Sequence, residues 1–557
     1  MNELSILIGG KAGFGIDKAS LIIASIMSRL GYSNYIYRDY PSLIRGGHTF
    51  SIIRASVEKV AAHRDKIDVL LALNQETIDL HKGRLKDRGI VVYDSDVIDS
   101  GSVSGIRDAI GLPLTGIVKE TGADDIIRNT CIIGAFARSV GIPWDILDFA
   151  FRNNISKELD QNLKAARRGF DASKEFIVIE NSAKEKMPLI TGNEALALGL
   201  LRAGLKSYIS YPMTSSSPIL HYLASLAEDF GLKVIHPESE LAVIMMALGM
   251  AYSGEKVAVG TSGGGFCLMT EGLSFSGMAE LPVVIILGQR PGPSTGLPTY
   301  SCQTELNFAL SAGQGEFARF VIAPADAEEA YFAARLSMGI SWRYQIPSII
   351  LTDKAMAEGC YSFNIDNCGE IKENTPVLWD KRGTYKRYAN TDTGISPLAF
   401  PGEKDVVIKA NSYEHDESGI STEDPSVTVK MQDKRLRKEK YMAIELEDYE
   451  CVKVYGNKDS VTAILCWGSN SGVCMEVAKA LGMKVIRPVV LSPFPVKQFR
   501  GAMEGVKKVI AVENNATGQL ARLVKEHGCG VSESILKYDG RNFTVEELEE
   551  RVRKVTG

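Results

Sequence analysis

The chain has 557 residues, of which 45% are hydrophobic and 24% charged, a composition typical of a globular protein with roughly three or four domains. The formal net charge of -5 at pH 7 gives no reason to expect binding to nucleic acid or to an anionic membrane surface. No apolar run approaches the ~18 residues of a membrane span. Residues 1–9 lack a basic segment and lead directly into a predicted strand, so we expect no signal peptide.

The nine cysteines are scattered along the chain, and none of them forms a C-x-x-C pair. Iron–sulfur and zinc sites usually need such close spacing. We therefore expect that this chain holds no metal or cluster of its own. An odd, scattered set of cysteines is typical of a reducing compartment, and the cytoplasm is the expected location.

Residues 1–175 are predicted to form a first α/β domain. A strand at 4–9 leads into a glycine-rich turn, Gly9–Asp17, and then into a helix over Lys18–Leu30. The turn matches neither phosphate-binding fingerprint, because Lys18 stands where the dinucleotide motif needs its third glycine and Ile16 where the P-loop needs lysine. Two interpretations remain open, an anion-binding helix N-terminus and a tight turn between strand and helix.

A second loop in this domain, Arg38–His48, contains two adjacent glycines. A contact with a ligand or subunit and a plain loop are equally compatible with it. The domain is followed by a predicted linker at residues 176–190.

Residues 191–360 are predicted to form the second domain, in which buried strands alternate with helices. The first four predicted strands are Ser207–Ser210, Lys233–His236, Lys256–Gly260 and Pro282–Leu287. Strict alternation implies a parallel sheet with right-handed crossovers. The turns after these strands therefore meet at the carboxyl edge of the sheet, where ligands bind in such folds.

These turns supply a hydroxyl at Thr214, a carboxylate at Glu240, a glycine-rich bend at Ser262–Gly265 and a guanidinium at Arg290. Glu240 is predicted to begin a helix. A carboxylate in an apolar site can bind a heterocycle nitrogen, an arginine can bind a substrate carboxylate through two bonds, and a hydroxyl can position a carbonyl. No Ser/His/Asp arrangement, H-E-x-x-H motif or EF-hand loop is present in the sequence.

Residues 361–450 are polar and are predicted to form an irregular connecting segment. His415, which lies between carboxylates, is interpreted as a solvated loop residue in preference to a metal ligand. Lys434–Lys440 is interpreted as a solvated helical face. Residues 451–557 are predicted to form a third α/β domain, which makes the fold class α/β with three doubly wound parallel-sheet domains.

The segment Tyr211-Pro212-Met213-Thr214-Ser215-Ser216-Ser217 resembles the Y-P-I-T-P-x-S motif of the 2-oxoacid:ferredoxin oxidoreductases. The supporting segments are 192–195, 238–240, 261–266, 289–299, 394–397, 414–417, 513–515 and 518–519. Together the chain resembles a fused gamma–alpha subunit of the 2-oxoglutarate (2-oxoglutarate synthase) type. The first domain, with Arg45-Gly46-Gly47, resembles the gamma unit, the second a thiamine-diphosphate pyrimidine-binding domain and the third a transketolase C-terminal domain.

The resemblance implies oxidative decarboxylation of a 2-oxoacid with coenzyme A and transfer of two electrons, one at a time, to ferredoxin. Glu240 matches the glutamate that binds the aminopyrimidine of thiamine diphosphate. Thr214 would contact the substrate at the reacting centre, and Arg290 would bind its carboxylate. The resemblance further places Tyr211, Pro212, Ser262 and Gly263 at the cofactor and Ser294 and Thr295 at the substrate.

The family's G-D-G…N motif, which binds the diphosphate and magnesium, is absent from the sequence, as are cluster cysteines. In the family these reside on a separate beta subunit. The resemblance therefore implies a partner that carries Mg²⁺ and a [4Fe-4S] cluster, thiamine diphosphate shared between the subunits, and a dimer of heterodimers. This chain alone is expected to be inactive.

The sequence departs from the family most clearly at Tyr300–Leu306, where the family often continues T-E-Q-x-D-L. Met213 and Ser215 are milder departures. Pyruvate, branched-chain and aryl 2-oxoacids therefore remain alternative substrates, and reversal to fix carbon dioxide is open. Two other hypotheses are a nucleotide-dependent synthetase or dehydrogenase that uses the Gly9–Gly15 turn, and a non-catalytic assembly subunit.

Overall fold

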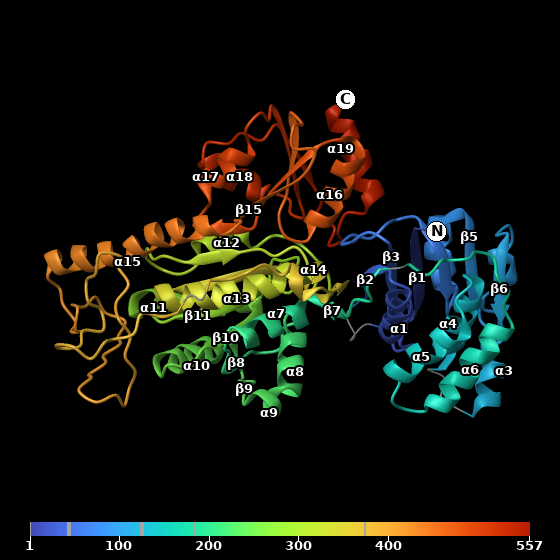
Figure 1. Cartoon of the computed structure of the whole chain (residues 1–557), viewed down its shortest axis with the longest axis horizontal. Helices are drawn as coiled ribbons and strands as arrows, with labels where there is room; N and C mark the ends of the chain where they lie inside the picture. Colours follow the sequence, from blue (N-terminus) through green and yellow to red (C-terminus); the bar gives the residue numbers. More distant parts are fainter. Residues whose placement is uncertain (1, 42–45, 123–126, 183, 373–374) are drawn as a thin grey trace. The chain divides into compact units, whose positions relative to one another are not determined.

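A computed structural model describes residues 2–41, 46–122, 127–182, 184–372 and 375–557 (Figure 1). The chain divides into two compact units. Unit 1 comprises Met1–Ile190, Glu358–Asn364 and Phe543–Arg553, and unit 2 comprises Thr191–Ala357, Ile365–Asn542 and Lys554–Gly557.

Unit 1 is built on an eight-stranded sheet with the order β6-β5-β4-β1-β3-β2-β14-β7. Its strands are β1 (Glu3–Lys11), β2 (Ser33–Asp39), β3 (His48–Ser56), β4 (Ile67–Ala72), β5 (Leu85–Asp94), β6 (Asp108–Leu112), β7 (Leu189–Thr191) and β14 (Cys360–Ser362). β4 runs parallel to β1, and β5 and β6 continue in the same direction. This half of the sheet confirms the predicted α/β class.

The other half of the sheet in unit 1 is antiparallel. β3 pairs antiparallel with β1 over nine residues, from Glu3↔Ser56 to Lys11↔His48, and β2 pairs antiparallel with β3. The segment between β2 and β3 is too short for the helical crossover that a parallel pair requires. The first sheet is therefore mixed, and the expectation of a wholly parallel sheet was wrong here.

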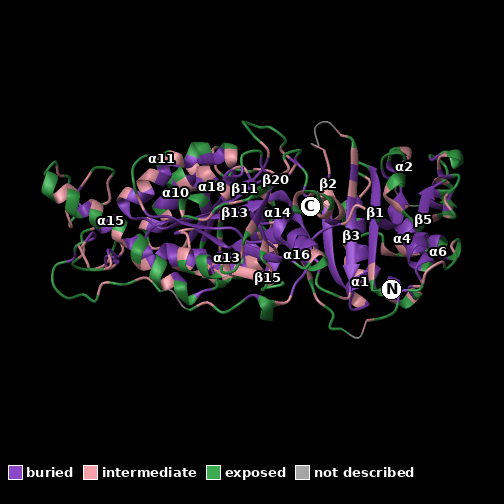
Figure 2. Cartoon of the chain, turned by 90° about the horizontal axis from the view of Figure 1, so that it is seen from above, coloured by how far each residue is buried: buried purple, intermediate pink, exposed green. Residues whose placement is uncertain are grey.

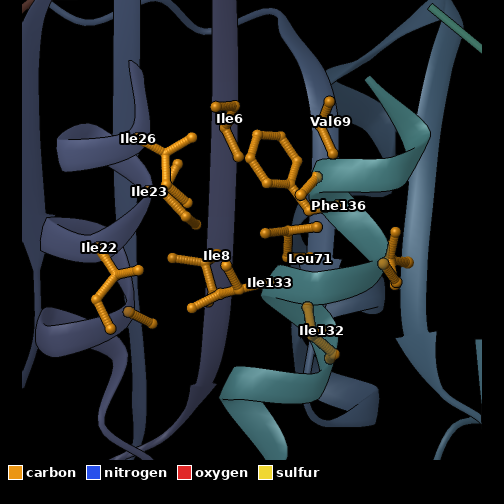
Figure 3. Packing of buried hydrophobic residues seen from close by; sticks show 14 of the residues in the cluster. Ile6, Ile8, Ile22, Ile23, Ile26, Val69, Leu71, Ile132, Ile133 and Phe136 are labelled. Atoms are coloured by element: carbon orange, nitrogen blue, oxygen red, sulfur yellow. The ribbon is translucent and has the colours of Figure 1, made fainter. Parts of the chain in front are cut away.

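The helices of unit 1 are α1 (Ile16–Arg29), α2 (Gln75–His81), α3 (Leu114–Thr121), α4 (Arg128–Ser139), α5 (Trp144–Asn154) and α6 (Leu159–Asp171), with α19 (Val545–Thr556) at the end of the chain. Helices α1 and α3 to α6 share a core of apolar side chains with the sheet (Figure 3). Ile26 of α1 and Phe136 of α4 lie close to Ile6 of β1, and Ile22 of α1 lies level with Ile8 of the same strand. Burial of such side chains stabilises a fold by roughly 1.5–3 kcal/mol each.

The glycine-rich turn of unit 1 ends at Gly15, whose φ of 70° is left-handed, and α1 begins at the next residue. The Asn129 side-chain amide donates to the carbonyls of Phe14 and Gly15, at 3.2 and 3.3 Å. These bonds fit a tight turn between strand and helix. In the second loop, Gly46 and Gly47 have φ values of 64° and 128°, whereas Arg45 lies outside the described residues.

Unit 2 contains a seven-stranded sheet with the order β18-β12-β13-β11-β10-β8-β9. Its strands are β8 (Ser207–Ile209), β9 (Lys233–Ile235), β10 (Val257–Ser262), β11 (Val283–Gln289), β12 (Phe320–Ile322), β13 (Pro347–Asp353) and β18 (Val490–Ser492). The first six are mutually parallel, as predicted, and only β18 is antiparallel, to β12. Strands β8, β10, β11, β12 and β13 are buried throughout, whereas the edge strand β9 is only partly buried (Figure 2).

Helices follow the strands of this sheet, as the alternation in the sequence predicts. They are α7 (Gly192–Arg202), α8 (Ser217–Ser225), α9 (Ala227–Phe230), α10 (Glu240–Tyr252), α11 (Gly263–Ala279), α12 (Leu306–Ser311), α13 (Ala327–Tyr344) and α14 (Lys354–Glu358). α10 and α11 share an apolar cluster with Val257 and Val259 of β10, whereas α7 packs against α13. Thr191 and Glu194 form a capping box that fixes the start of α7.

A five-stranded sheet with the order β15-β17-β16-β19-β20 completes unit 2. Its strands are β15 (Val452–Gly456), β16 (Thr462–Leu465), β17 (Lys484–Pro488), β19 (Lys508–Glu513) and β20 (Glu533–Leu536), and its helices are α16 (Asn470–Leu481), α17 (Val496–Ala502) and α18 (Gln519–Glu526). All pairings are parallel except β15 with β17. This sheet confirms the third predicted α/β region.

Within the polar segment at 361–450, residues Pro425–Glu445 form the 21-residue helix α15. Lys434 and Lys438 on this helix are fully buried and both pair with Glu280. The interpretation of Lys434–Lys440 as a solvated face was therefore wrong, because two of its lysines form ion pairs with a buried carboxylate. His415 is also buried, not solvated, with Nδ1 2.9 Å from the Tyr413 carbonyl oxygen.

Candidate active site at the carboxyl edge of the seven-stranded sheet

The Tyr211–Ser217 turn follows β8 and is tied to β11, which lies two strands away in the sheet. The Ser215 hydroxyl donates to the carbonyl oxygen of Gly288 on β11 at 2.9 Å, and the Asn193 amide donates to the Ser215 carbonyl at 3.2 Å. A β-carbon on Gly288 would lie 2.4 Å from the Ser215 hydroxyl, so only glycine permits this approach. Thr214, which is half-buried, is thereby held at the sheet edge.

Glu240 is the first residue of α10, as predicted, and its side chain is buried, with 3% exposed. The Thr261 hydroxyl lies 3.5 Å from Oε1 of Glu240, at the limit of a hydrogen bond. A carboxylate at the start of a helix is stabilised by the helix dipole. Glu240 can therefore stay buried and still offer an oxygen to a ligand.

The three glycines predicted as a bend form the first turn of α11, and each borders a different part of the site. A β-carbon on Gly263 would lie 2.7 Å from Oε1 of Glu305, and one on Gly265 would lie 2.2 Å from Oε1 of Glu240. A β-carbon on Gly264 would meet only the Ser294 carbonyl oxygen, at 4.0 Å. The absence of side chains therefore allows two carboxylates to approach one helix N-terminus.

Arg290 follows β11 and is 8% exposed. Its Nη2 lies 4.0 Å from the sulfur of Met213, which brings the guanidinium to the Tyr211–Ser217 turn. Burial lowers the pKa of Arg290, and the charges of Glu305 and Glu240 partly offset that effect. Among the described residues Nε has no hydrogen-bond partner, so a donor is free for an anionic ligand.

Glu305 is a buried carboxylate that the sequence predictions did not include. Its Oε1 accepts from the Thr304 hydroxyl at 2.8 Å, and its backbone N–H donates to the Gln289 side chain at 3.1 Å. Burial raises the pKa of Glu305 to about 7, although the Thr304 hydrogen bonds and the Arg290 charge lower it. The only signal in the sequence was its place in the Tyr300–Leu306 departure.

The Tyr300–Leu306 loop is fixed by Gln303, whose side chain joins it to the five-stranded domain. Gln303 donates to the Trp467 carbonyl at 2.8 Å and accepts from the Asn470 amide at 2.8 Å and the Asn514 N–H at 3.0 Å. The Gln519 amide donates to the Thr304 carbonyl at 2.8 Å. The third domain therefore holds the loop that carries Glu305.

The structure does not bring every predicted site residue into this buried group. Tyr211 is exposed and stacks edge-on with His236, at 6.0 Å between ring centroids, and Pro212 is exposed too. Ser294, with a φ of 57°, and Thr295 lie on an exposed loop. Ser262 is fully buried, and its hydroxyl has no partner in the described part of the chain.

Thr214, Glu240, the α11 N-terminus and Arg290 thus lie together at one sheet edge, as the sequence predicts. The carboxylate and guanidinium can bind a polar heterocycle and an anionic group. Within the described ranges, no three His, Cys, Asp or Glu side chains are grouped to hold a metal ion. Nor does any helix in those ranges have the length and apolar character to cross a lipid bilayer.

Comparison with known proteins agrees with this geometry. Residues 198–434 match the family described as pyruvate flavodoxin/ferredoxin oxidoreductase, thiamine diP-binding. Residues 5–172 match pyruvate ferredoxin/flavodoxin oxidoreductase, and residues 461–548 match pyruvate:ferredoxin oxidoreductase core domain II. A 2-oxoacid:ferredoxin oxidoreductase alpha subunit from a Sulfolobus species is 31% identical, over 99% of this chain and 97% of that protein.

The chain belongs to the 2-oxoacid:ferredoxin oxidoreductases. Its relatives in that family include the 2-oxoglutarate oxidoreductase subunit KorA of Mycobacterium tuberculosis, 27% identical over 99% of this chain and 91% of the relative. Among solved structures, a 2-oxoglutarate:ferredoxin oxidoreductase from Magnetococcus marinus, with 2-oxoglutarate, coenzyme A and succinyl-CoA bound, is 29% identical. It superposes with a TM-score of 0.90 over 100% of this chain and 99% of that one.

These matches confirm the family resemblance over the whole chain. The alignment with the Sulfolobus alpha subunit covers 99% of this chain, and therefore includes the first domain. They also confirm that the protein is an oxidoreductase subunit with a thiamine-diphosphate-binding domain. The roles of individual residues stay predictions.

Proposed function

We propose that this chain is the alpha subunit of an enzyme that converts 2-oxoglutarate, coenzyme A and two oxidised ferredoxins to succinyl-CoA, carbon dioxide, a proton and two reduced ferredoxins. The support is the full-length similarity to the Magnetococcus marinus enzyme, together with the relative from Mycobacterium tuberculosis. Ferredoxin as acceptor and 2-oxoglutarate as substrate are parts of the proposal.

The observation that carries the proposal is the buried Glu240 at the edge that also holds Arg290. Thiamine diphosphate fits this edge because a buried carboxylate can bind the aminopyrimidine. The Ser262 hydroxyl, which has no partner among the described residues, can donate or accept one more bond. When bound, thiamine diphosphate supplies the electron sink for loss of carbon dioxide. Glu240, Ser262 and the Gly263 backbone would hold its pyrimidine side.

Arg290 would bind the carboxylate next to the keto group of the substrate. Two observations support this role: Nε has no hydrogen-bond partner in the part of the chain that the structure describes, and the guanidinium lies close to Met213. A guanidinium donates two parallel bonds to a carboxylate. Thr214 would donate to the substrate carbonyl oxygen.

A second subunit would complete the site. α10 and α11 are apolar on their buried and their exposed sides, and Leu241, Met245 and Leu268 are 45–50% exposed. A helix that is apolar all round is typical of a buried position, and so large an apolar face favours a protein partner. This partner would be a beta subunit that carries the diphosphate, the Mg²⁺ and the [4Fe-4S] cluster, in a cytoplasmic dimer of heterodimers.

The test is anaerobic purification of the native complex through this chain, followed by viologen reduction with coenzyme A and a panel of 2-oxoacids. Reduction that depends on 2-oxoglutarate, with a cluster-bearing partner, is the expected result. Preference for pyruvate, a branched-chain or an aryl 2-oxoacid would keep the chemistry and refute the substrate. A complex without thiamine or partner would refute the proposal.

A further inference from the structure

Glu305 is a buried carboxylate near Arg290 for which the proposed chemistry has no use. Its side chain is 9% exposed, and its Oε2 has no hydrogen-bond partner in the described part of the chain. An unpartnered carboxylate oxygen in a buried site is costly unless the group carries a proton or meets a ligand.

The described neighbours of Glu305 include few charged groups. From the α11 side it meets Gly263, which carries no side chain, and from α18 the neutral Gln519 holds the preceding residue. Arg290 at the end of β11 is the nearby cation.

Two other titratable groups, Cys302 and Glu240, interact with Glu305 or with Arg290. Cys302 lies on the same loop, and burial raises the pKa of its thiol, helped by the charges of Glu305 and Asp353. Glu240 acts on the same guanidinium as Glu305 does. Of the two carboxylates whose charge acts on Arg290, Glu305 therefore has the larger effect.

We propose that Glu305 is a positioning residue for substrate binding: when it is neutral, Arg290 is free to bind the substrate carboxylate, and when it is ionised it competes for the guanidinium. This inference rests on the proposed role of Arg290. The geometry supports it. The Glu305 backbone N–H donates a hydrogen bond to the side-chain oxygen of Gln289 at 3.1 Å, and Gln289 directly precedes Arg290.

The competition changes with pH in the neutral range, since burial raises the pKa of Glu305 to about 7. Above that value the ionised carboxylate opposes an anionic substrate, and below it the neutral acid does not. Substrate affinity therefore falls as pH rises. By linkage, binding of the substrate favours the protonated acid and takes up a proton.

The experiment compares the wild-type complex with Glu305→Gln, Glu305→Asp and Thr304→Val from about pH 6 to about pH 8.5. We expect the wild-type KM for the 2-oxoacid to rise roughly three- to tenfold over this range, as for one charge near a partly screened site. Glu305→Gln should keep the low wild-type KM of acidic pH over the whole pH range. Its kcat should differ from wild type by a smaller factor than its KM does. Glu305→Asp retains the rise.

Thr304→Val removes a hydrogen bond that stabilises the ionised form, so the rise in its KM moves to higher pH. Calorimetry of the complex with an unreactive oxamate-type analogue of the substrate, in buffers of different ionisation enthalpy, adds a readout that needs no turnover. We expect proton uptake near pH 7 in wild type and its loss in Glu305→Gln. Glu228→Gln, on exposed α9, is the control.

A KM–pH curve in Glu305→Gln that matches wild type, or unchanged proton uptake, would overturn the inference. Failure of the underlying proposal gives a different result, because Arg290→Lys would then leave the KM unaltered at every pH. If Glu305→Gln does not assemble, the shift in Thr304→Val decides, and an unshifted curve counts against Glu305.

Discussion

The carboxylate of Glu240 lies in the space that a side chain at Gly265 would need. The ideal β-carbon position of Gly265 is 2.2 Å from Oε1 of Glu240 and 2.1 Å from the Thr261 hydroxyl. Neither of the two neighbours is a freely mobile surface group, because both are buried. The carboxylate can therefore occupy this position only because residue 265 has no side chain.

Gly265→Ala should displace Glu240 and lower 2-oxoacid-dependent viologen reduction about a hundredfold, the usual effect of misplacing a catalytic group by ~1 Å. Gly264→Ala, one residue earlier in the same helical turn, meets nothing closer than 4.0 Å and should retain most of the activity. Equal losses in both variants would show that the helix start, not the carboxylate, matters.

Glu240→Gln should abolish turnover while the complex still assembles. The amide keeps the size of the side chain but cannot exchange a proton with the aminopyrimidine. Gel filtration, bound thiamine and steady-state rates measure the three properties separately. Unimpaired turnover in this variant would favour the assembly-subunit hypothesis.

Arg290→Lys should raise the KM for the 2-oxoacid by roughly ten- to a hundredfold, since a lysine cannot donate the two parallel bonds of a guanidinium. Coenzyme A provides the internal control. Its KM should stay within about twofold of wild type, and an equal rise for both substrates would indicate general damage to the site.

The buried ion cluster at Glu280 should control the stability of unit 2. The Lys434 ammonium is 2.6 and 2.8 Å from the two Glu280 oxygens, and Lys438 pairs with the same carboxylate. Glu280→Gln leaves both lysines without a counterion and should destabilise unit 2 by about 3–5 kcal/mol. Lys438→Met keeps the ion pair between Lys434 and Glu280 and should lower the stability of unit 2 far less. Thermal unfolding of the complex measures both changes.

The same cluster predicts a dependence on acid. Burial raises the pKa of Glu280, but the charges of Lys434 and Lys438 outweigh it and hold the pKa well below its usual value. A carboxyl with a depressed pKa contributes stability above its unfolded-state pKa, and this is lost as pH falls below about 4.5. The acid-induced fall of the melting temperature should therefore be shallower in Glu280→Gln than in wild type.

Local patterns in the sequence were enough to predict the second sheet and the start of α10 at Glu240, because strand, turn and helix signals there agree. They did not reveal the burial of Lys434 and Lys438, which depends on Glu280, more than 150 positions away in the chain. Nor could they find Glu305, since only the fold places it beside Arg290. The antiparallel half of the first sheet depends on the short connection between β2 and β3. We missed it because we expected strands and helices to alternate throughout the domain.

β18 closes the edge of the seven-stranded sheet by pairing Val321 with Ser492 and Ile322 with Val490. During synthesis, the ribosome makes β12 about 170 residues before the strand that covers it. Until then β12 offers free backbone groups, a common starting point for aggregation. Fragments of unit 2 that stop before residue 490 should therefore be poorly soluble, and full-length expression is the sound route to this subunit.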